Sequence, residues 1–207
     1  MAGAKTISEQ LFEEFCRVNG VPCVRVERDI HKTPDYVITL RDSPVTCEVK
    51  QIDLSPEDER LIAEVSQGRA IGVHLPNRFR ETLKRVSAQL KGAARAGQPT
   101  LLVVYDNTPY KAYTDHADVV QAMFGRSSVS VTRELSVSAP FFGGDRGLGP
   151  TWNTAVSAIA ILDGGPLEVS SVRVYHNVYA AVRLDPSAFD SLAVRQMVLP
   201  DATHVKL

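Results

Sequence analysis

The sequence predicts an α/β fold built on a mixed central sheet flanked by helices. The first observation is a strand, helix, strand pattern: residues 45–51 and 100–105 are typical of buried strands, and the amphipathic stretch 76–96 lies between them. A helix of that length can return the chain so that the two strands run parallel. The second observation is that β-prone runs continue in the C-terminal half, which predicts extra strands there.

Length and composition favour one domain over residues 1–207, with its core at about 6–110, since 44% of the 207 residues are hydrophobic. No apolar run is long enough for a transmembrane helix, and residues 1–6 lack the apolar core of a signal peptide. We therefore expect a soluble, cytoplasmic protein without a membrane partner. The three cysteines contain no CxxC pair and the five histidines show no HExxH spacing, so no disulfide framework or zinc site is indicated.

The first expected element is an amphipathic helix over residues 8–18, because its apolar residues recur at helical spacing and Asn19-Gly20 follows as a stop signal. Next comes a hairpin, in which the β-prone runs 34–40 and 45–51 are joined by a turn at 41–44. Side chains on a strand alternate between its two faces. The second strand thus has an apolar face of Val45, Cys47 and Val49 and a polar face of Thr46, Glu48 and Lys50.

Three residues of this hairpin have the chemistry of a metal-dependent phosphodiesterase. If the strands pair, Asp35 lies near Glu48 and Lys50. Magnesium prefers hard oxygen ligands and needs only one or two carboxylates from the protein. A bound metal activates water and neutralises phosphate charge, and a nearby ammonium stabilises the transition state. The alternative interpretation is an exposed ion pair beside a turn aspartate.

Residues 55–64 begin with Ser-Pro-Glu-Asp-Glu, a helix N-terminus whose acids we assign to capping and solubility. The helix at 76–96 follows, and basic residues gather on it. We interpret four of them as nucleic-acid-binding, because a charged helix face can follow a phosphate backbone. A solvated surface helix is the alternative. The four residues are Arg78, Arg80, Lys84 and Arg85.

In the C-terminal half we expect a short helix at 115–124, an edge strand at 129–137 and two strands at 156–162 and 172–179. These strands either extend the sheet or form a layer that flanks it. The glycine-rich stretch 142–150 lacks the Gly-Lys-Ser/Thr ending of a P-loop, so it is interpreted as a surface loop that can act as a lid.

Pro34-Asp35 followed by Glu48-Val49-Lys50 resembles the PD-(D/E)xK nuclease superfamily, after a helix that bears glutamates. The resemblance covers the chain from Glu9 to about Tyr105. It implies a restriction-endonuclease-like fold and a nuclease that hydrolyses phosphodiester bonds. DNA is the expected substrate, and RNA is the alternative.

The same resemblance implies the roles of individual residues. Asp35, Glu48 and the backbone carbonyl of Val49 would bind Mg²⁺, with Mn²⁺ as an alternative, and Lys50 would act on the water or the transition state. Glu9 and Gln51 complete the expected catalytic set as supporting residues, with Glu13 as the fallback for the helix glutamate. Because many relatives cut as pairs, a homodimer is left open.

Two other functional classes stay open. The first is a catalytically inactive member of the same fold that binds nucleic acid or a protein. The second is a small-ligand enzyme that uses the glycine-rich loop and His176. Metal binding at Asp35 and Glu48 separates the nuclease from the first class.

Overall fold

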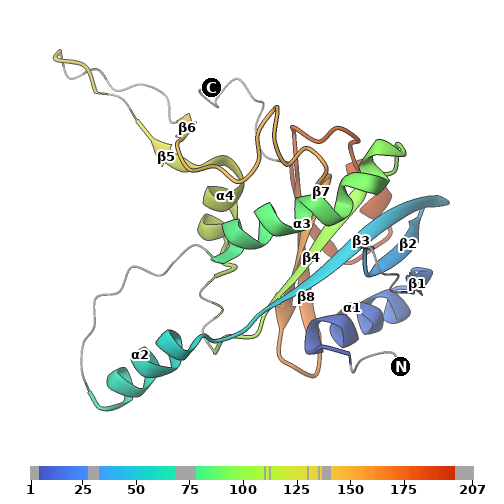
Figure 1. Cartoon of the computed structure of the whole chain (residues 1–207), viewed down its shortest axis with the longest axis horizontal. Coiled ribbons are helices and arrows are strands. Elements are labelled where there is room, and N and C mark those ends of the chain that lie inside the picture. Colours follow the sequence, from blue (N-terminus) through green and yellow to red (C-terminus); the bar gives the residue numbers. More distant parts are fainter. Residues whose placement is uncertain are drawn as a thin grey trace.

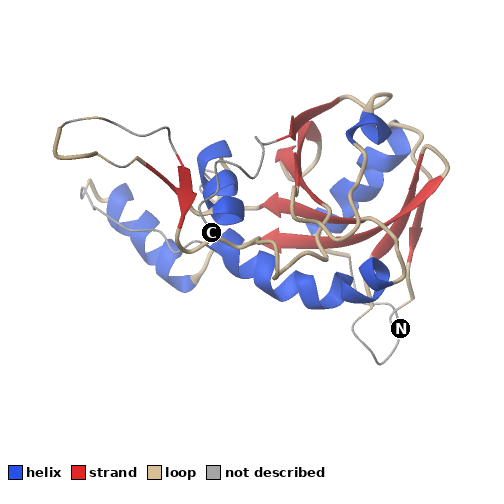
Figure 2. Cartoon of the chain, turned by 90° about the horizontal axis from the view of Figure 1, so that it is seen from above, coloured by secondary structure: helices blue, strands red, loops and turns tan. Residues whose placement is uncertain are grey.

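The computed structural model describes residues 5–27, 33–68, 78–109, 111, 113–129, 131–134, 136 and 141–198. Within these residues the protein is α/β, with seven strands in one mixed sheet and helices on both sides of it (Figure 2). None of the helices described combines the length and the apolar character needed to cross a membrane. The predicted fold class is confirmed at this level.

The sheet of the described chain has the order β1-β2-β3-β4-β7-β8-β9, and a separate ribbon pairs β5 with β6 (Figure 1). Three pairs are parallel, namely β3–β4, β4–β7 and β8–β9. Three pairs are antiparallel, namely β1–β2, β2–β3 and β7–β8. The strands are β1 Cys23–Arg25, β2 Tyr36–Leu40, β3 Ser43–Ile52, β4 Thr100–Asp106, β5 Arg126–Ser128, β6 Phe141–Gly143, β7 Ala158–Gly164, β8 Val169–His176 and β9 Val194–Val198. The helices are α1 Ile7–Val18, α2 Pro56–Ser66, α3 Arg78–Arg95, α4 His116–Phe124 and the 3₁₀ turn η1 Pro186–Phe189.

The predicted hairpin is present as β2 and β3, but its turn is tighter than the sequence suggested. Only Arg41 and Asp42 form the turn, with φ values of 44° and 63°, and the next two residues already belong to β3. A two-residue turn with left-handed backbone matches the twist of the flanking strands, which explains why the strand starts early. Tyr36 pairs with Cys47, so the residue before β2 lies beside Glu48.

The predicted crossover is confirmed: β3 and β4 run parallel and α3 connects them. The expected helix started at residue 76, and residues 76 and 77 lie outside the described part of the chain. Every residue of β4 is buried, as its unbroken apolar sequence predicts for the centre of a sheet with both faces covered.

Two hydrophobic layers enclose the sheet. One contains Leu11 and Phe12 of α1 together with Cys47 and Val49 of β3. The other contains the buried stripe of α3, residues of α4, and Ile52. Since side chains alternate along β3, its apolar odd-numbered residues face α1, and the even-numbered residues face α3.

The C-terminal half extends the sheet as expected, because β7 and β8 pair with each other and β7 joins β4. The expected edge strand at 129–137 is wrong in position: the strand observed is β5, which ends at Ser128, and several residues after it lie outside the described part. Gly125, with φ 92°, ends α4, and β5 starts at the next residue. The glycine-rich stretch 142–150 begins in β6 and places Leu148 in the core, so only part of it is a surface loop.

Candidate active site

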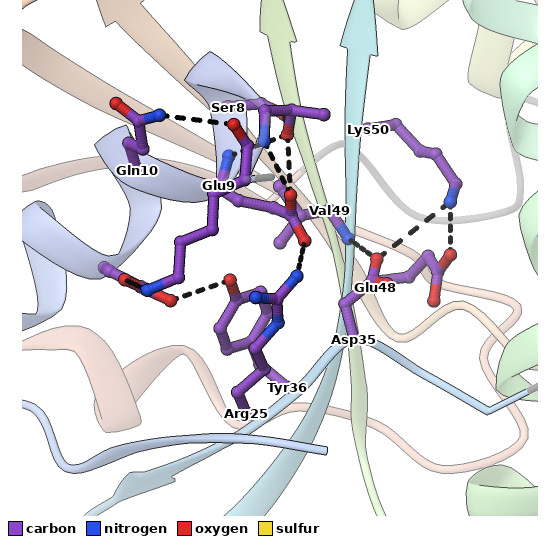
Figure 3. A network of polar contacts seen from close by, with 12 residues as sticks. Ser8, Glu9, Gln10, Arg25, Asp35, Tyr36, Glu48, Val49 and Lys50 are labelled. Atoms are coloured by element: carbon purple, nitrogen blue, oxygen red, sulfur yellow. Dashed lines mark hydrogen bonds and ion pairs between the residues drawn. The ribbon is translucent and has the colours of Figure 1, made fainter. Parts of the chain in front are cut away.

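The strand β3 brings a buried glutamate and a lysine together on the face that α3 covers. The Glu48 side chain is fully buried and the Lys50 side chain is 33% exposed. The Lys50 ammonium forms an ion pair with Oε1 of Glu48, and its Nζ lies 4.0 Å from Oδ2 of Asp35 (Figure 3). Asp35, Glu48 and Lys50, which the sequence selected, are therefore neighbours.

Glu48 is the least satisfied member of this group. Its Oε2 is buried and has no hydrogen-bond partner among the described residues. The pKa of Glu48 is raised to about 7: burial is the largest cause, the Lys50 ammonium lowers the pKa, and the nearby Asp35 raises it. Burying an unpaired carboxylate oxygen is unfavourable, so such an atom calls for an explanation beyond packing.

Asp35, just before β2, is held by two hydrogen bonds with the backbone of β3. Its amide donates to the carbonyl of Cys47 at 3.1 Å, and its Oδ2 accepts from the amide of Val49 at 3.0 Å. The side chain is 10% exposed. These bonds fix the carboxylate beside Glu48. Val49 thus takes part through its amide, while the role expected for its carbonyl stays a prediction.

Two carboxylates converge here, and no group of three or more His, Cys, Asp or Glu side chains among the described residues is arranged to hold a metal ion. A magnesium ion needs only one or two protein carboxylates, with water and substrate oxygens completing its shell. Asp35 and Glu48 supply hard oxygen donors of that kind, and the buried Oε2 of Glu48 has lone pairs to donate. The donor set therefore fits a divalent ion, although Lys50 now occupies part of the same space.

Glu9 lies on α1, on the other side of β3 from Lys50 (Figure 3), and Gln51 also contacts α1. Oε1 of Gln51 accepts from the amide of Ser8 at 3.0 Å, and its Nε2 donates to Asp53. Glu9 is 4% exposed; it accepts from Arg25 at 2.8 Å and from the amide of Thr6 at 2.8 Å. Both residues fix the start of α1 against the sheet, and their supporting role in catalysis stays a prediction.

The fallback residue Glu13 is also engaged on this side. It forms an ion pair with Lys5 at 2.6 Å and accepts from the hydroxyl of Tyr36 at 2.9 Å. The hydrogen bond to Glu13 and burial both raise the pKa of the Tyr36 hydroxyl, with burial as the larger cause.

The basic residues selected on α3 fall into two groups. Arg78 pairs with Asp58 at 2.6 Å, and Arg80 donates to the carbonyl of Asp145 at 2.9 Å, so both reach inwards to other elements. Lys84 is exposed, and the side chain of Arg85 is 76% exposed beside Glu81. Asp58 caps α2 as expected, and it also accepts from Tyr113, a connection that the sequence did not indicate.

Sequence reasoning missed the signal that explains Glu9. Thr6-Ile7-Ser8-Glu9 has the pattern of a capping box, in which the Thr6 hydroxyl accepts from the Glu9 amide and the Glu9 carboxylate accepts from the Thr6 amide. Arg25 could not be identified, because nothing in the local sequence links it to α1.

Known proteins offer no guide to this site. No family model, curated protein or solved structure significantly matches the chain. The resemblance to the PD-(D/E)xK superfamily thus depends on the residues themselves, of which Asp35, Glu48 and Lys50 are neighbours and Glu9 and Gln51 lie across β3 from them.

Proposed function

We propose that the protein is a metal-dependent nuclease with a restriction-endonuclease-like fold that hydrolyses phosphodiester bonds in DNA. The observation that supports this is the buried Oε2 of Glu48, which has no described hydrogen-bond partner, on a carboxylate whose other oxygen pairs with Lys50. A purely structural ion pair would satisfy both oxygens of its buried carboxylate. A site that binds a cation needs such an oxygen, because its lone pairs remain available to the ion.

The roles of the residues follow from their chemistry. Asp35 and Glu48 would hold Mg²⁺ or Mn²⁺, which supplies a water of lowered pKa and neutralises charge on the phosphate when it is bound. Lys50 contributes a partly exposed ammonium, which can move from Glu48 to a phosphate oxygen once the carboxylate has another cation. The amide of Val49 keeps Asp35 aimed at the site throughout.

The proposal is tested by incubating plasmid, single-stranded DNA and RNA with wild type and Lys50→Ala, each in magnesium, manganese or EDTA. We expect DNA to be cut in the presence of metal and the cutting to disappear in Lys50→Ala. Arg17→Ala, an exposed substitution on α1, is the matched control and should cut like wild type. Metal-bound protein that cuts none of these substrates would instead favour an inactive member of the fold that binds nucleic acid or a protein.

A further inference from the structure

A cavity of about 340 Å³ lies where β8 and β9 end. Its volume is at the lower end of the range for small-molecule sites, so it suits a small ligand better than a stretch of polymer. Its apolar wall includes Val178, Leu184, Pro186 and Val198. In the sheet, β4 and β7 separate β8 from β3, so this cavity is distinct from the candidate active site.

Two polar residues of the wall are engaged with the protein itself. Asn177 donates to the carbonyl of Val156 at 2.7 Å and accepts from the amide of Tyr179 at 2.9 Å. The hydroxyl of Ser157 accepts from the amide of Thr100 at 2.9 Å and donates to a backbone carbonyl. These bonds hold the wall together and give no reason to expect a ligand.

His176 differs from these two residues, because one of its ring nitrogens is unsatisfied. The residue lines the cavity and is 6% exposed. Its Nε2 lies 2.9 Å from Oε1 of Gln196, so Nε2 carries the proton and Nδ1 keeps a lone pair. Nδ1 is buried and has no hydrogen-bond partner among the described residues. A buried acceptor of this kind calls for a donor that the described chain does not supply.

The other polar residues of the wall carry opposite charges. Arg183 and Asp185 both line the cavity and are exposed, on either side of the buried Leu184. Arg183 makes a long hydrogen bond, at 3.4 Å, to the carbonyl of Val178, and neither charge has an ion pair within the described ranges. A cation and an anion that are both unpaired at one cavity match a ligand that carries both charges.

The Asp185 carboxylate keeps its charge and lies near His176. Its Oδ1 accepts from the amide of Ser187 at 2.9 Å, which caps η1. Hydrogen bonds from Ser187 are the largest cause of a lowered pKa for Asp185, and Arg41 and His176 contribute through their charge. A ligand ammonium at this end of the cavity can therefore meet a carboxylate oxygen and an imidazole lone pair together.

We propose that this cavity binds a free α-amino acid with an apolar side chain. The ammonium group donates to Asp185 and to Nδ1 of His176, and the carboxylate accepts from Arg183. The apolar side chain lies against Leu184 and Val178. A ligand with only negative charge would leave Asp185 unpaired and be repelled by it. The inference goes beyond the proposed nuclease and does not depend on it.

The first test is a calorimetric titration of the full chain, in EDTA, with L-leucine, L-methionine and L-phenylalanine. We expect at least one of them to bind, with one molecule per chain. The N-acetyl and the amide derivatives of the best ligand each remove one of its two charges. Each derivative should bind roughly 10- to 150-fold more weakly, because a charge-assisted hydrogen bond is lost.

Variants test the two charged residues separately. Arg183→Gln and Asp185→Asn each remove a charge with little change in size, and asparagine can still cap η1. Each variant should weaken binding by roughly 10- to 150-fold. Arg17→Gln, which changes an exposed arginine on α1, is the matched control and should bind as wild type does.

Nitrogen NMR of the histidine rings gives a separate readout for His176. The Nδ1 signal should move when the amino acid binds, because its lone pair accepts a proton donor, and it should not move in Asp185→Asn at the same ligand concentration.

The inference is wrong if all three amino acids have dissociation constants above about 1 mM, if either derivative binds as tightly as its parent, or if both charge variants keep wild-type affinity. The titration contains neither metal nor nucleic acid. A protein that binds the amino acid but never cuts DNA would therefore refute the nuclease proposal alone.

Discussion

Two buried glutamates on opposite sides of β3 differ in how their charge is satisfied. Glu9, on the α1 side, has one oxygen on Arg25 and the other on the amide and hydroxyl of Thr6. Glu48, on the α3 side, has one oxygen on Lys50 and the other buried without a described partner. Both are almost inaccessible to solvent, so burial alone does not separate them.

The difference teaches which carboxylate has a structural role. A buried charge that is paired and hydrogen-bonded at both oxygens holds its surroundings in place, as Glu9 does for the start of α1. A buried carboxylate with an open lone pair is costly for folding, and sites that perform chemistry tolerate such costs. The hypothesis tested below is that Glu9 acts mainly in the framework and Glu48 in the proposed chemistry.

The largest expected effect separates the two residues by activity. Glu48→Gln removes a metal-binding oxygen without changing shape, and we expect metal-dependent DNA cleavage to fall about 100- to 1,000-fold. Glu9→Gln is the matched control, because it makes the same isosteric change across the strand, and it should stay within about tenfold of wild type. Initial rates on a plasmid measure both. Equal losses in the two variants would refute the assignment.

The framework is tested by stability instead. Arg25→Met removes the ion pair between Arg25 and the buried Glu9 carboxylate, so the free energy of unfolding should fall by about 2 kcal/mol. This is less than the loss of a fully buried pair, since the Arg25 side chain is 30% exposed. Urea unfolding monitored by circular dichroism gives the value. An unchanged midpoint would mean that the Glu9 contacts do not hold α1.

For Glu48 we expect the opposite effect: its substitution should stabilise the protein at high pH. The pKa of Glu48 is raised from its ordinary value of 4.5 to about 7, so the folded state binds its proton more tightly than the unfolded state does. The protein without metal should therefore lose stability as pH rises from about 4.5 to 7. Glu48→Gln removes this dependence and should be more stable than wild type at pH 8, by roughly 1 to 3 kcal/mol in EDTA. Thermal unfolding at pH 5 and pH 8 tests this, and a Glu48→Gln protein less stable than wild type at pH 8 would contradict it.

The smallest effect concerns Gln51. Gln51→Ala removes the acceptor for the Ser8 amide, which can turn to water at the helix start, and we expect a loss of about 1 kcal/mol in the free energy of unfolding. Cleavage should change by less than tenfold. A loss of cleavage of more than tenfold, at an unfolding free energy lowered by only about 1 kcal/mol, would instead support a catalytic role for Gln51.

The sequence predicted the strands well where pattern and environment agree. The alternation at 45–51 identified both faces of β3, and the unbroken apolar run at 100–105 identified the buried strand β4. Local signals were enough there, because period and burial are set by neighbouring residues.

The ion pairs and the unsatisfied oxygen of Glu48 could not be predicted, because they depend on contacts between residues that are far apart in the sequence. Arg25 meets Glu9 from a separate strand, and Arg126 and Arg80 meet only through a third element, so no spacing in the chain predicts these pairs. The unsatisfied oxygen of Glu48 is likewise a property of packing. The sequence identified Glu48 as a candidate, but it could not show whether both of its carboxylate oxygens are hydrogen-bonded.

The central claim is that Glu48 keeps an open oxygen for a divalent ion. Calorimetric titration of Mn²⁺ at pH 8 into wild type, Glu48→Gln and Glu9→Gln tests this directly, without any substrate. We predict one bound ion in wild type and in Glu9→Gln, and none in Glu48→Gln. Equal binding by all three proteins, or by none, would contradict the account.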